Sequence, residues 1–457
     1  TWDLVKTDLL GAFGPDIFDP HGEVNRPALA RKAFESPAQT RKLNRITMPR
    51  IEELFVDKLD ELKKNGCKAV VVEYSVYKNR QSSMAYAADV VLAVLAPVDV
   101  RLKRAIAAGW AEDDVRRRIA QQITDAERIE ESDVVFNNDG TPEQLRDAYR
   151  AQGYSVLCIT DHEYLLDHSN LNLPDFLMLT GYELYIKSSK DREEAFHCPM
   201  VHLNLIARET SNVRLICVDP EYMLYACKYT DVTQLPRVGE LCHRHYSPSW
   251  INRVTREAQE NGFMVFYNHP SWNLESSATY LQYENLTGIE IYNNNNANTG
   301  FPRDDAAVYD QFLRAGRHVV ATANDDNHNK RALDDPLSDS FGGFNMIKAE
   351  RLDYASIVAA IEAGAFYASQ GPEIKRLYVQ DKQVHIECAD AREICLVTVG
   401  RSASRGRAPR ICAPKGQSIT EASFEIRPDD EYFRLEVIDH AGYKAFTNAY
   451  FTCDILG

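Results

Sequence analysis

The sequence predicts an α/β protein with a small antiparallel β-domain at its C-terminus. Through the first 370 residues, apolar runs of strand length alternate with helical stretches, as in sheets covered by helices. From about residue 371 the apolar side chains recur at every second position, with turn signals between the runs, which is typical of antiparallel strands. At 457 residues, 44% of them hydrophobic, the chain is long enough for roughly two to four domains. We therefore expect three parts, residues 1–138, 139–370 and 371–457.

The composition argues against several classes of protein. A formal charge of −15, from 67 acidic against 52 basic residues, argues against a nucleic acid polymer as partner, because phosphate backbones require a basic surface. The longest apolar runs, such as residues 90–97, are far shorter than the roughly 20 residues of a membrane-spanning helix, so we expect no membrane partner. The 10 cysteines form no C-x-x-C pair, which favours reduced core thiols and a cytoplasmic location.

The first part, residues 1–138, is predicted to contain βα units. Two strand-like runs, residues 67–74 and 90–95, occur in helical sequence rich in Arg and Lys. Each run is followed by a polar helical stretch, as expected for parallel strands joined by crossover helices.

The middle part, residues 139–370, contains six apolar runs separated by helical sequence. They are residues 155–160, 176–180, 201–206, 264–268, 288–293 and 318–323. Polar side chains stand at the ends of these runs, where α/β folds place their active sites. The asparagine-rich stretch 293–298 is predicted to be either a polar loop or a loop that faces a substrate.

The last part, residues 371–457, is predicted to be a β-domain that follows the linker 369–372. Its alternating runs are residues 376–379, 384–387, 394–399, 422–426, 432–438 and 445–451. Asp381-Lys382 and Ala441-Gly442 are the turn signals between neighbouring runs.

Histidines and carboxylates at the ends of the middle runs carry most of the chemical information. Imidazole and carboxylate together are the ligands of zinc, manganese and iron(II). Each residue alone has a simpler explanation as a structural hydrogen-bonding group or a helix cap. However, five separate segments each deliver a suitable ligand to the strand ends, which favours one shared metal site. The residues are Asp161, His162, Glu183, His202, His269, Asp325, Asp326 and His328.

The motifs around these residues resemble those of the PHP (polymerase and histidinol phosphatase) superfamily over about residues 138–457. They are Thr160-Asp161-His162, Gly181-Tyr182-Glu183, Val201-His202-Leu203, Asn268-His269-Pro270 and Asp326-Asn327-His328. The resemblance implies a distorted (β/α)7 barrel with two or three divalent ions, zinc, manganese or iron. By the same resemblance the metal ligands are Asp139, His162, Glu183, His202, His269, Asp326 and His328, and His269, Asp326 and His328 are the catalytic residues. The implied reaction is hydrolysis of a small phosphorylated metabolite or nucleotide by metal-activated water.

One departure from the PHP pattern bears on this prediction. The family carries His-x-His a few residues before its Asp-Gly, whereas this chain has Ser132-Asp133-Val134-Val135-Phe136-Asn137 there. We therefore expect at least one metal position to be weakened or absent, with Asp133 as a candidate substitute. The alternative is a degenerate barrel that binds metal or ligand without turnover.

The first part resembles dephospho-CoA kinases over about residues 3–150. The motifs are Phe13-Gly14, residues 22–30, Ala33-Phe34, Leu43-Asn44, Met48-Pro49, and the later stretches 102–104, 118–122 and 132–140. The resemblance implies a P-loop-kinase-like α/β segment and, as an alternative function, ATP-dependent phosphorylation of the ribose 3′-hydroxyl of dephospho-CoA. The phosphate-cradling motif G-x-x-x-x-G-K-[ST] does not occur in the 457 residues, so this alternative requires a P-loop upstream of residue 1. Arg101, Arg104 and Arg118 either contact nucleotide phosphates or are surface charges.

Overall fold

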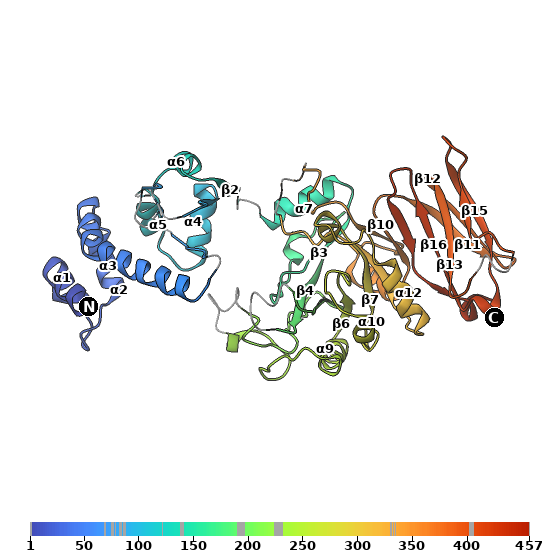
Figure 1. The fold of residues 1–457 in the computed structure, drawn as a ribbon, viewed down its shortest axis with the longest axis horizontal. Helices are drawn as coiled ribbons and strands as arrows, with labels where there is room; N and C mark the ends of the chain where they lie inside the picture. The colour runs from blue at the N-terminus through green and yellow to red at the C-terminus, as the bar shows by residue number, and fades with distance from the viewer. Residues whose placement is uncertain are drawn as a thin grey trace. The chain divides into compact units, whose positions relative to one another are not determined.

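The computed structural model describes residues 2–67, 70–74, 77, 79–81, 85, 88–120, 122–137, 141–189, 197–223, 232–329, 331, 333, 335–401 and 406–456. The chain divides into two compact units, which we call unit one (Thr1–Thr141) and unit two (Pro142–Gly457). Figure 1 shows the elements of both units. Among the described residues, no helix combines the length and apolar character needed to cross a membrane. The finer division of unit two at residue 370 stays a prediction.

Unit one begins with three packed helices, α1 (Trp2–Phe13), α2 (Arg26–Ala33) and α3 (Pro37–Lys64). Their small core consists of Val5, Leu9, Phe13, Ala33 and Ile17, the last in the short helix η1 (Pro15–Ile17). The second and third helices start where the sequence supplies a cap. Asn25 Oδ1 accepts a hydrogen bond from the Ala28 amide at 3.1 Å, and Ser36 Oγ accepts one from the Gln39 amide at 3.3 Å.

The sheet of unit one consists of two parallel strands, β1 (Leu92–Leu95) and β2 (Val134–Asn137). Helices α4 (Val98–Ala107), α5 (Glu112–Ile119) and α6 (Asp125–Glu130) lie between them in the chain. The strand expected at residues 67–74 is wrong for the described part of that run, which carries no strand assignment. Val71 is 97% exposed, and an apolar run without a partner strand cannot form a ladder.

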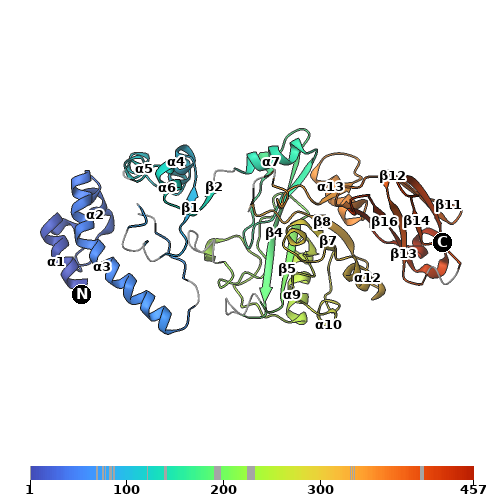
Figure 2. The same cartoon turned by 45° about the horizontal axis from the view of Figure 1, so that its top comes forward.

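Unit two is built on a six-stranded mixed sheet with the order β3-β4-β5-β6-β7-β8. The bounds are β3 (Val156–Ile159), β4 (Leu177–Lys187), β5 (Met200–Ala207), β6 (Phe263–Tyr267), β7 (Gly288–Asn293) and β8 (Val320–Asn324). Five runs of the middle part coincide with these strands to within two residues; the second, residues 176–180, covers only the start of β4. Figure 2 shows β4 and β5 extending together through this sheet.

The sheet is mixed because β5 runs antiparallel to both of its neighbours, whereas β3, β4, β6, β7 and β8 pair in parallel where they meet. The mixed α/β class is therefore confirmed, but the seven-stranded barrel is not. An antiparallel pair needs no crossover helix, and the chain passes from β4 to β5 within residues 188–199. The sheet ends at the edge strands β3 and β8.

Helices cover this sheet and form its core. Helices α9 (Pro248–Glu260) and α12 (Ala306–Arg314) pack on one face with alternate residues of the strands, and α13 (Tyr354–Glu362) packs against the opposite set. In β6, for example, Val265 belongs to the first cluster and Phe266 to the second. The other helices among the described residues of this region are α7 (Pro142–Ala151), η2 (Ser169–Leu171), η3 (Val232–Gln234), α10 (Ser277–Tyr280) and α11 (Asn294–Asn298).

The C-terminal region of unit two contains two antiparallel sheets that share one hydrophobic core. The larger sheet contains β9 (Phe344–Ile347), β10 (Phe366–Ser369), β13 (Glu393–Thr398), β14 (Arg410–Cys412), β16 (Tyr432–Ile438), β17 (Lys444–Thr447) and β18 (Tyr450–Phe451). The smaller contains β11 (Ile374–Gln380), β12 (Gln383–Ala391) and β15 (Ile419–Glu425). The short helices η5 (Pro428–Asp430) and α14 (Thr452–Leu456) complete the region.

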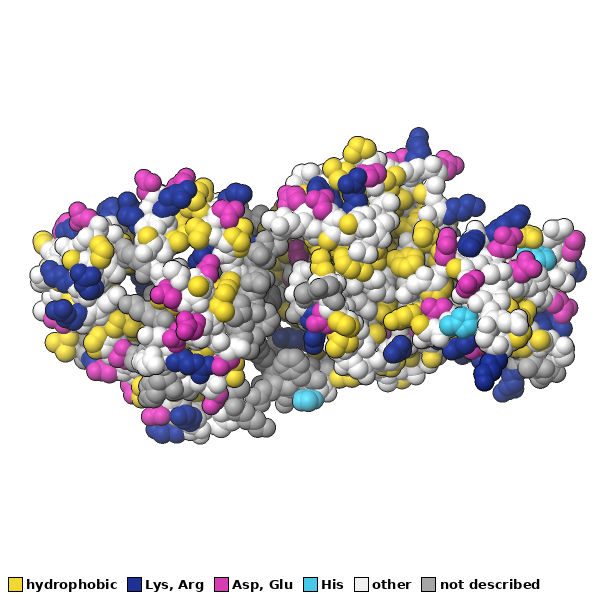
Figure 3. Space-filling model, turned by 90° about the horizontal axis from the view of Figure 1, so that it is seen from above, with side chains coloured by type: hydrophobic (Ala, Val, Ile, Leu, Met, Phe, Trp, Pro, Cys, Tyr) yellow, Lys and Arg dark blue, Asp and Glu magenta, His cyan; other side chains and the backbone are white. Residues whose placement is uncertain are grey.

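The turn at Asp381-Lys382 follows the sequence prediction. Asp381 and Lys382 adopt φ angles of 49° and 60°, the left-handed conformation that a two-residue hairpin turn requires. The missed strands are β14, which is only three residues long, and β9 and β10, which precede residue 371. Figure 3 shows acidic and basic side chains interspersed over the C-terminal region, as in a solvated surface.

Candidate metal centre

Strands β4 and β5 turn one face to the core of unit two and the other face to a cluster of histidines. Tyr182 and Leu184 pack in the core, so the two-residue period of the strand places Glu183 on the opposite face. On β5, Val201 and Leu203 are core residues, and His202 faces the same side as Glu183. A parallel bridge pairs His162, just after β3, with Glu183.

These strands bring three predicted ligands together. The Glu183 carboxylate lies 3.2 Å from His162 Nδ1 through Oε2 and 2.9 Å from His202 Nδ1 through Oε1. The ligand atoms of the three residues all lie within 4.8 Å of one another. Glu183 is only 4% exposed, and a buried carboxylate is found with partners or a metal.

His269 completes this group, which we call the Glu183 cluster (His162, Glu183, His202 and His269). It follows β6 with a φ of 29°, and its Nε2 lies 3.4 Å from Glu183 Oε1. Its ring centroid lies 5.0 Å from that of His202 and 4.9 Å from that of Trp272. Three imidazoles therefore surround one carboxylate.

Two members of the cluster, Glu183 and His202, have protonation states that suit a cation. Although burial opposes ionisation, the neighbouring His202, His269 and His162 hold the pKa of Glu183 well below its usual range. Burial lowers the pKa of His202, and the attraction of Glu183 only partly offsets this effect. The carboxylate is therefore anionic and His202 neutral at pH 7, the forms in which both bind divalent ions. The third buried member differs: although burial lowers the pKa of His269, the hydrogen bond to Glu183 and the charges of Glu290 and Asp326 raise it to about 9.

Two ring nitrogens of the cluster lack hydrogen-bond partners. Nδ1 of His162 and Nδ1 of His269 are buried, and neither makes a hydrogen bond. Buried polar atoms are rarely left in this state, because each one costs the free energy of its lost hydration. The donor set of imidazole nitrogens and a carboxylate, together with these two atoms that make no hydrogen bond, fits a zinc, manganese or iron ion.

Asp326 and His328 lie beside the cluster. Asp326 Oδ1 is 3.4 Å from His328 Nδ1, and the His328 ring centroid is 5.9 Å from that of His162. Asp326 adopts a φ of 54°, in the left-handed region that non-glycine residues rarely occupy. The structure thus brings together every predicted ligand except Asp139, which lies outside the described residues.

Asp133, the candidate substitute ligand, has other partners within unit one. Its Oδ2 accepts a hydrogen bond from the Val91 amide at 2.7 Å and pairs with the Arg80 guanidinium. These contacts hold its pKa below the usual range, the backbone hydrogen bond most strongly. Its carboxylate therefore serves to connect the start of β1 to the start of β2.

The sequence prediction missed Glu290, which supports the cluster from β7. Its Oε2 accepts hydrogen bonds from the His269 amide at 2.8 Å and from Asn293 Nδ2 at 3.0 Å, and its Oε1 accepts one from Asn324 Nδ2 at 2.7 Å. Burial, reinforced by Asp326, raises the pKa of Glu290 to about 7 even though His269 lowers it. The signal in the sequence was a glutamate inside an otherwise apolar strand, because such a residue is almost never buried without partners.

The asparagine stretch 293–298 forms the short helix α11, so the expectation of a loop is wrong. Asn293 caps the helix by accepting a hydrogen bond from the Asn296 amide at 3.0 Å. Its Nδ2 and that of Asn295 lie 3.3 and 3.2 Å from Asp326 Oδ2. Asn294 fills the space that a side chain on Gly342 would occupy, since a Cβ there would lie 2.1 Å from it. The amides thus orient a predicted ligand.

Asp325 has a structural role next to this ligand. Its carboxylate accepts hydrogen bonds from Tyr149 Oη at 2.6 Å and from the amides of Phe341, Gly342 and Gly343 at 2.7 to 2.9 Å. These four donors satisfy the carboxylate and connect the end of β8 to α7 and to the segment before β9.

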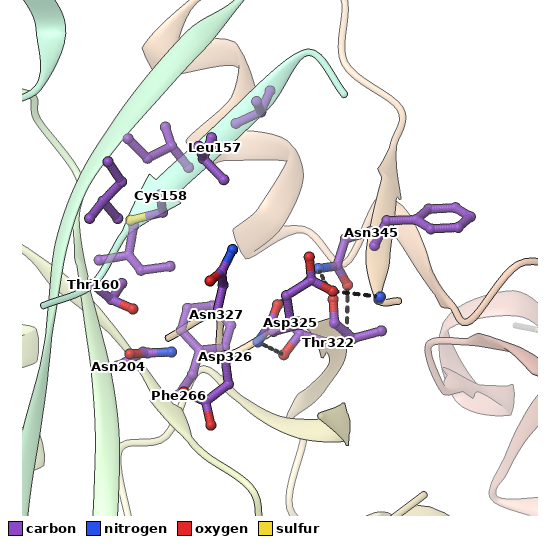
Figure 4. A pocket seen from close by; sticks show the side chains of 18 of the residues that line it. Leu157, Cys158, Thr160, Asn204, Phe266, Thr322, Asp325, Asp326, Asn327 and Asn345 are labelled. Carbon is purple, nitrogen blue, oxygen red and sulfur yellow. Dashed lines mark hydrogen bonds between the residues drawn. The ribbon is translucent and has the colours of Figure 1, made fainter. Parts of the chain in front are cut away.

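A cavity of about 520 Å³ adjoins the cluster. Both edge strands of the sheet line it, with Cys158 and Thr160 next to β4 and with Thr322 and Asp325 on the other wall (Figure 4). Its volume is within the roughly 300–1,000 Å³ of small-molecule sites. His162, Glu183, Asp326 and His328 also line this cavity, so the predicted ligands are accessible from it.

The comparison with protein families concerns unit one. A family model described as dephospho-CoA kinase matches residues 5–144. The dephospho-CoA kinase of Corynebacterium efficiens is 42% identical over 140 residues, which cover 30% of this chain and 69% of that protein. The enzyme of the same name from Corynebacterium glutamicum is 41% identical over 141 residues, covering 30% of this chain and 68% of that protein. The chain belongs to the dephospho-CoA kinase family.

Two solved structures were also found. The protein TT1252 from Thermus thermophilus is 25% identical and covers 32% of this chain and 74% of its own, with a TM-score of 0.25. A two-domain protein containing a predicted PHP-like metal-dependent phosphoesterase, from Bacteroides vulgatus, is 13% identical and covers 67% of this chain and 89% of its own, with a TM-score of 0.29.

In the dephospho-CoA kinase segment, two of the three arginines singled out in the sequence have partners within the segment. Arg101 pairs with Asp125 at 2.9 Å. The Arg118 guanidinium lies 4.6 Å from the ring centroid of Phe34 and 4.7 Å from that of Trp110, an arrangement that stabilises a cation on aromatic faces.

Proposed function

We propose that unit two is a divalent-metal-dependent phosphoesterase that hydrolyses a small phosphorylated metabolite or nucleotide. The observation that supports this best is the Glu183 cluster, in which one buried carboxylate contacts three imidazoles and two ring nitrogens make no hydrogen bond. In the reaction, a water oxygen forms a bond to phosphorus, the ester P–O bond breaks, and the leaving oxygen takes a proton.

His162, Glu183 and His202 would hold one ion, and His269, Asp326 and His328 would extend the site to a second; Asp139 stays a predicted ligand. When bound, zinc, manganese or iron(II) supplies Lewis-acid character and the activated water that attack on phosphorus requires.

Other residues of the chain orient these ligands. Asn268 Nδ2 donates to Glu183 Oε1 at 2.8 Å, and Glu290 fixes the backbone of His269. The Trp272 ring lies 5.0 Å from that of His202 and covers two ligands with apolar surface, which keeps bulk water from them. Such supporting contacts commonly change metal affinity by about 10- to 100-fold when they are removed.

The test is the ion content of the purified chain together with hydrolysis of an aryl phosphate. We expect near-stoichiometric binding of zinc or manganese, and we expect Glu183→Gln to reduce both ion content and hydrolysis at least about 100-fold. Glu387→Gln, a partly exposed position on β12, is the matched control and should change neither. Hydrolysis that persists in the Glu183→Gln chain would contradict the proposal. Stoichiometric ions without any turnover would instead select the non-catalytic metal-binding barrel.

A second candidate function belongs to unit one. Its family membership favours ATP-dependent phosphorylation of the ribose 3′-hydroxyl of dephospho-CoA. Because the 457 residues contain no G-x-x-x-x-G-K-[ST] motif, we expect this activity only in a protein that carries such a loop upstream of residue 1. The measurement is conversion of dephospho-CoA to CoA by this chain and by the same chain extended with a P-loop segment. Equal conversion by both would contradict this expectation.

A further inference from the structure

A strip of side chains leads from the Glu183 cluster to the end of β4. Glu183, Tyr185 and Lys187 lie at every second position of the strand and therefore share one face. On the antiparallel neighbour β5, His202 lies opposite Tyr185 and Met200 lies opposite Lys187. The register thus places a predicted metal ligand, an aromatic ring and a cation in one row.

A pocket of about 220 Å³ opens along this strip. It is smaller than the roughly 300–1,000 Å³ of drug-sized sites, so it suits one small group. The lining residues are His162, Glu163, Tyr185, Lys187, Met200, His202, Tyr222 and Met223. Since His162 and His202 belong to the cluster, a ligand in this pocket reaches the predicted metal ligands.

The middle of the pocket has aromatic and thioether walls. The ring centroids of Tyr185 and Tyr222 are 5.0 Å apart at an interplanar angle of 69°. Two contacts hold the Tyr222 ring in place. Its hydroxyl accepts a hydrogen bond from the Lys187 amide at 3.3 Å, and the Arg244 guanidinium lies 5.0 Å from its ring centroid. These walls fit a planar ring or a short apolar spacer.

The two cations near the pocket differ in their availability. Arg244 is 1% exposed in its side chain and forms two hydrogen bonds with the Glu163 carboxylate, at 2.5 and 2.9 Å. Its charge is therefore neutralised. Lys187 Nζ lies 5.9 Å from the Tyr222 centroid, and within the described ranges no carboxylate forms an ion pair with it. Lys187 is thus the cation that the pocket offers to a ligand.

We infer that the substrate is a phosphomonoester whose leaving group carries a second negative charge, which Lys187 binds. The inference rests on the proposed function, since the scissile phosphate takes the place beside the Glu183 cluster. The ring or spacer of the leaving group lies along Tyr185 and Tyr222, and its carboxylate or second phosphate reaches the Lys187 ammonium. Lys187 is then a specificity-determining residue.

The test compares the binding of two phosphonates that cannot be hydrolysed. Phenylphosphonate and 4-phosphonobenzoate differ only in the second anion, and isothermal titration calorimetry on the manganese-loaded chain gives a Kd for each. We expect 4-phosphonobenzoate to bind roughly three- to tenfold more tightly, the range of one partly exposed charge pair. The preference should disappear in Lys187→Met and persist in Lys187→Arg. Lys382→Met, in the exposed turn between β11 and β12, is the control and should keep it.

The outcomes separate this inference from the proposed function because neither phosphonate requires turnover. A preference that Lys187→Met abolishes supports the inference even if aryl phosphates are not hydrolysed. Equal Kd values for the two phosphonates, or a preference that survives in Lys187→Met, would overturn it even if hydrolysis is observed. Failure of both phosphonates to bind would overturn it as well.

Discussion

The evidence for function is of a different kind in each of the two units. Unit one is 42% identical to a dephospho-CoA kinase, yet the partners of Arg101, Arg118 and Asp133 lie within the unit. In unit two the argument for function comes from geometry, with three predicted imidazole ligands around one buried carboxylate. Similarity of sequence thus identifies the family of unit one, whereas the convergence of side chains supports the proposed chemistry of unit two, and each can be tested without the other.

The largest effect is expected from the buried ion pair behind the pocket. Arg244→Met should destabilise unit two by roughly 3–5 kcal/mol, because the Glu163 carboxylate then stays buried without its partner. Since Glu163 follows His162 directly, ion content should fall as well. Hydrogen exchange resolved by peptide should show faster exchange in unit two and unchanged exchange in unit one.

Arg434→Met is the matched control for this variant. Arg434 is also buried, and it bonds Asp310 at 2.8 Å and Glu436 at 2.7 Å between α12 and β16. It should destabilise unit two by a similar amount and leave the ion content of the folded chain unchanged. If Arg434→Met lowered ion content as much as Arg244→Met, the link between the Glu163 pair and the cluster would be refuted.

A smaller effect is expected from the amides of α11. Asn295→Ala removes a donor 3.2 Å from Asp326 Oδ2, so manganese should bind roughly tenfold more weakly at the site that includes Asp326. Asn298→Ala, on the same short helix, removes a hydrogen bond to the Ser338 carbonyl instead and should leave the affinity unchanged. Titration calorimetry measures both, and equal losses would show that α11 acts only through its folding.

A change confined to unit one should leave the metal centre unaffected. Thr124 and Glu127 form a reciprocal cap at the start of α6, with hydrogen bonds of 3.2 and 2.7 Å. Thr124→Ala should cost about 1 kcal/mol of stability, seen as faster exchange in the peptides of α6. Changed manganese binding in this variant would disprove the independence of the two units.

The smallest effect concerns the pH dependence of unit two. Glu275 accepts hydrogen bonds from Tyr246 and Tyr267, both at 2.6 Å, and from Tyr283. Burial raises the pKa of Glu275 more than these donors lower it. A folded pKa above the unfolded value gives stability that is present below pH about 4.3 and is lost as the pH rises through the folded pKa. Glu275→Gln should therefore flatten the change in stability across this interval, by less than about 1 kcal/mol. Parallel urea-unfolding profiles for both chains would argue against it.

Strands marked by a local run of mainly apolar residues could be predicted from the sequence. Residues 288–293 and 432–438 were expected as strands, and β7 and β16 have those bounds. The strand β4 runs to Lys187, well beyond the expected end at residue 180, because its length is set by pairing with β5. Pairing with another strand leaves no signal in the strand's own residues.

The candidate site shows the same division between local and distant signals. The sequence predicted which strand ends carry His, Asp or Glu, and these residues do lie close together in the structure. Their role as metal ligands stays a prediction. The supporting role of Glu290 and the helix formed by the asparagine stretch could not be predicted, because they depend on hydrogen-bond partners from other segments, among them His269, Asp326 and Ser338. The sequence shows which polar side chains are present, but not which distant groups form hydrogen bonds with them.

Because Glu183, Tyr185 and Lys187 share one face of β4, the predicted ion site depends on the register in which β4 pairs with β5. A slip of one residue between β4 and β5 would carry Leu184 and Ile186 into the position of the ligands and would drive Glu183, charged, into the apolar core. Misaligned chains would thus lose their core and their ion site in the same event. An ion that binds at Glu183 would therefore bind only to molecules in which β4 and β5 pair in the correct register.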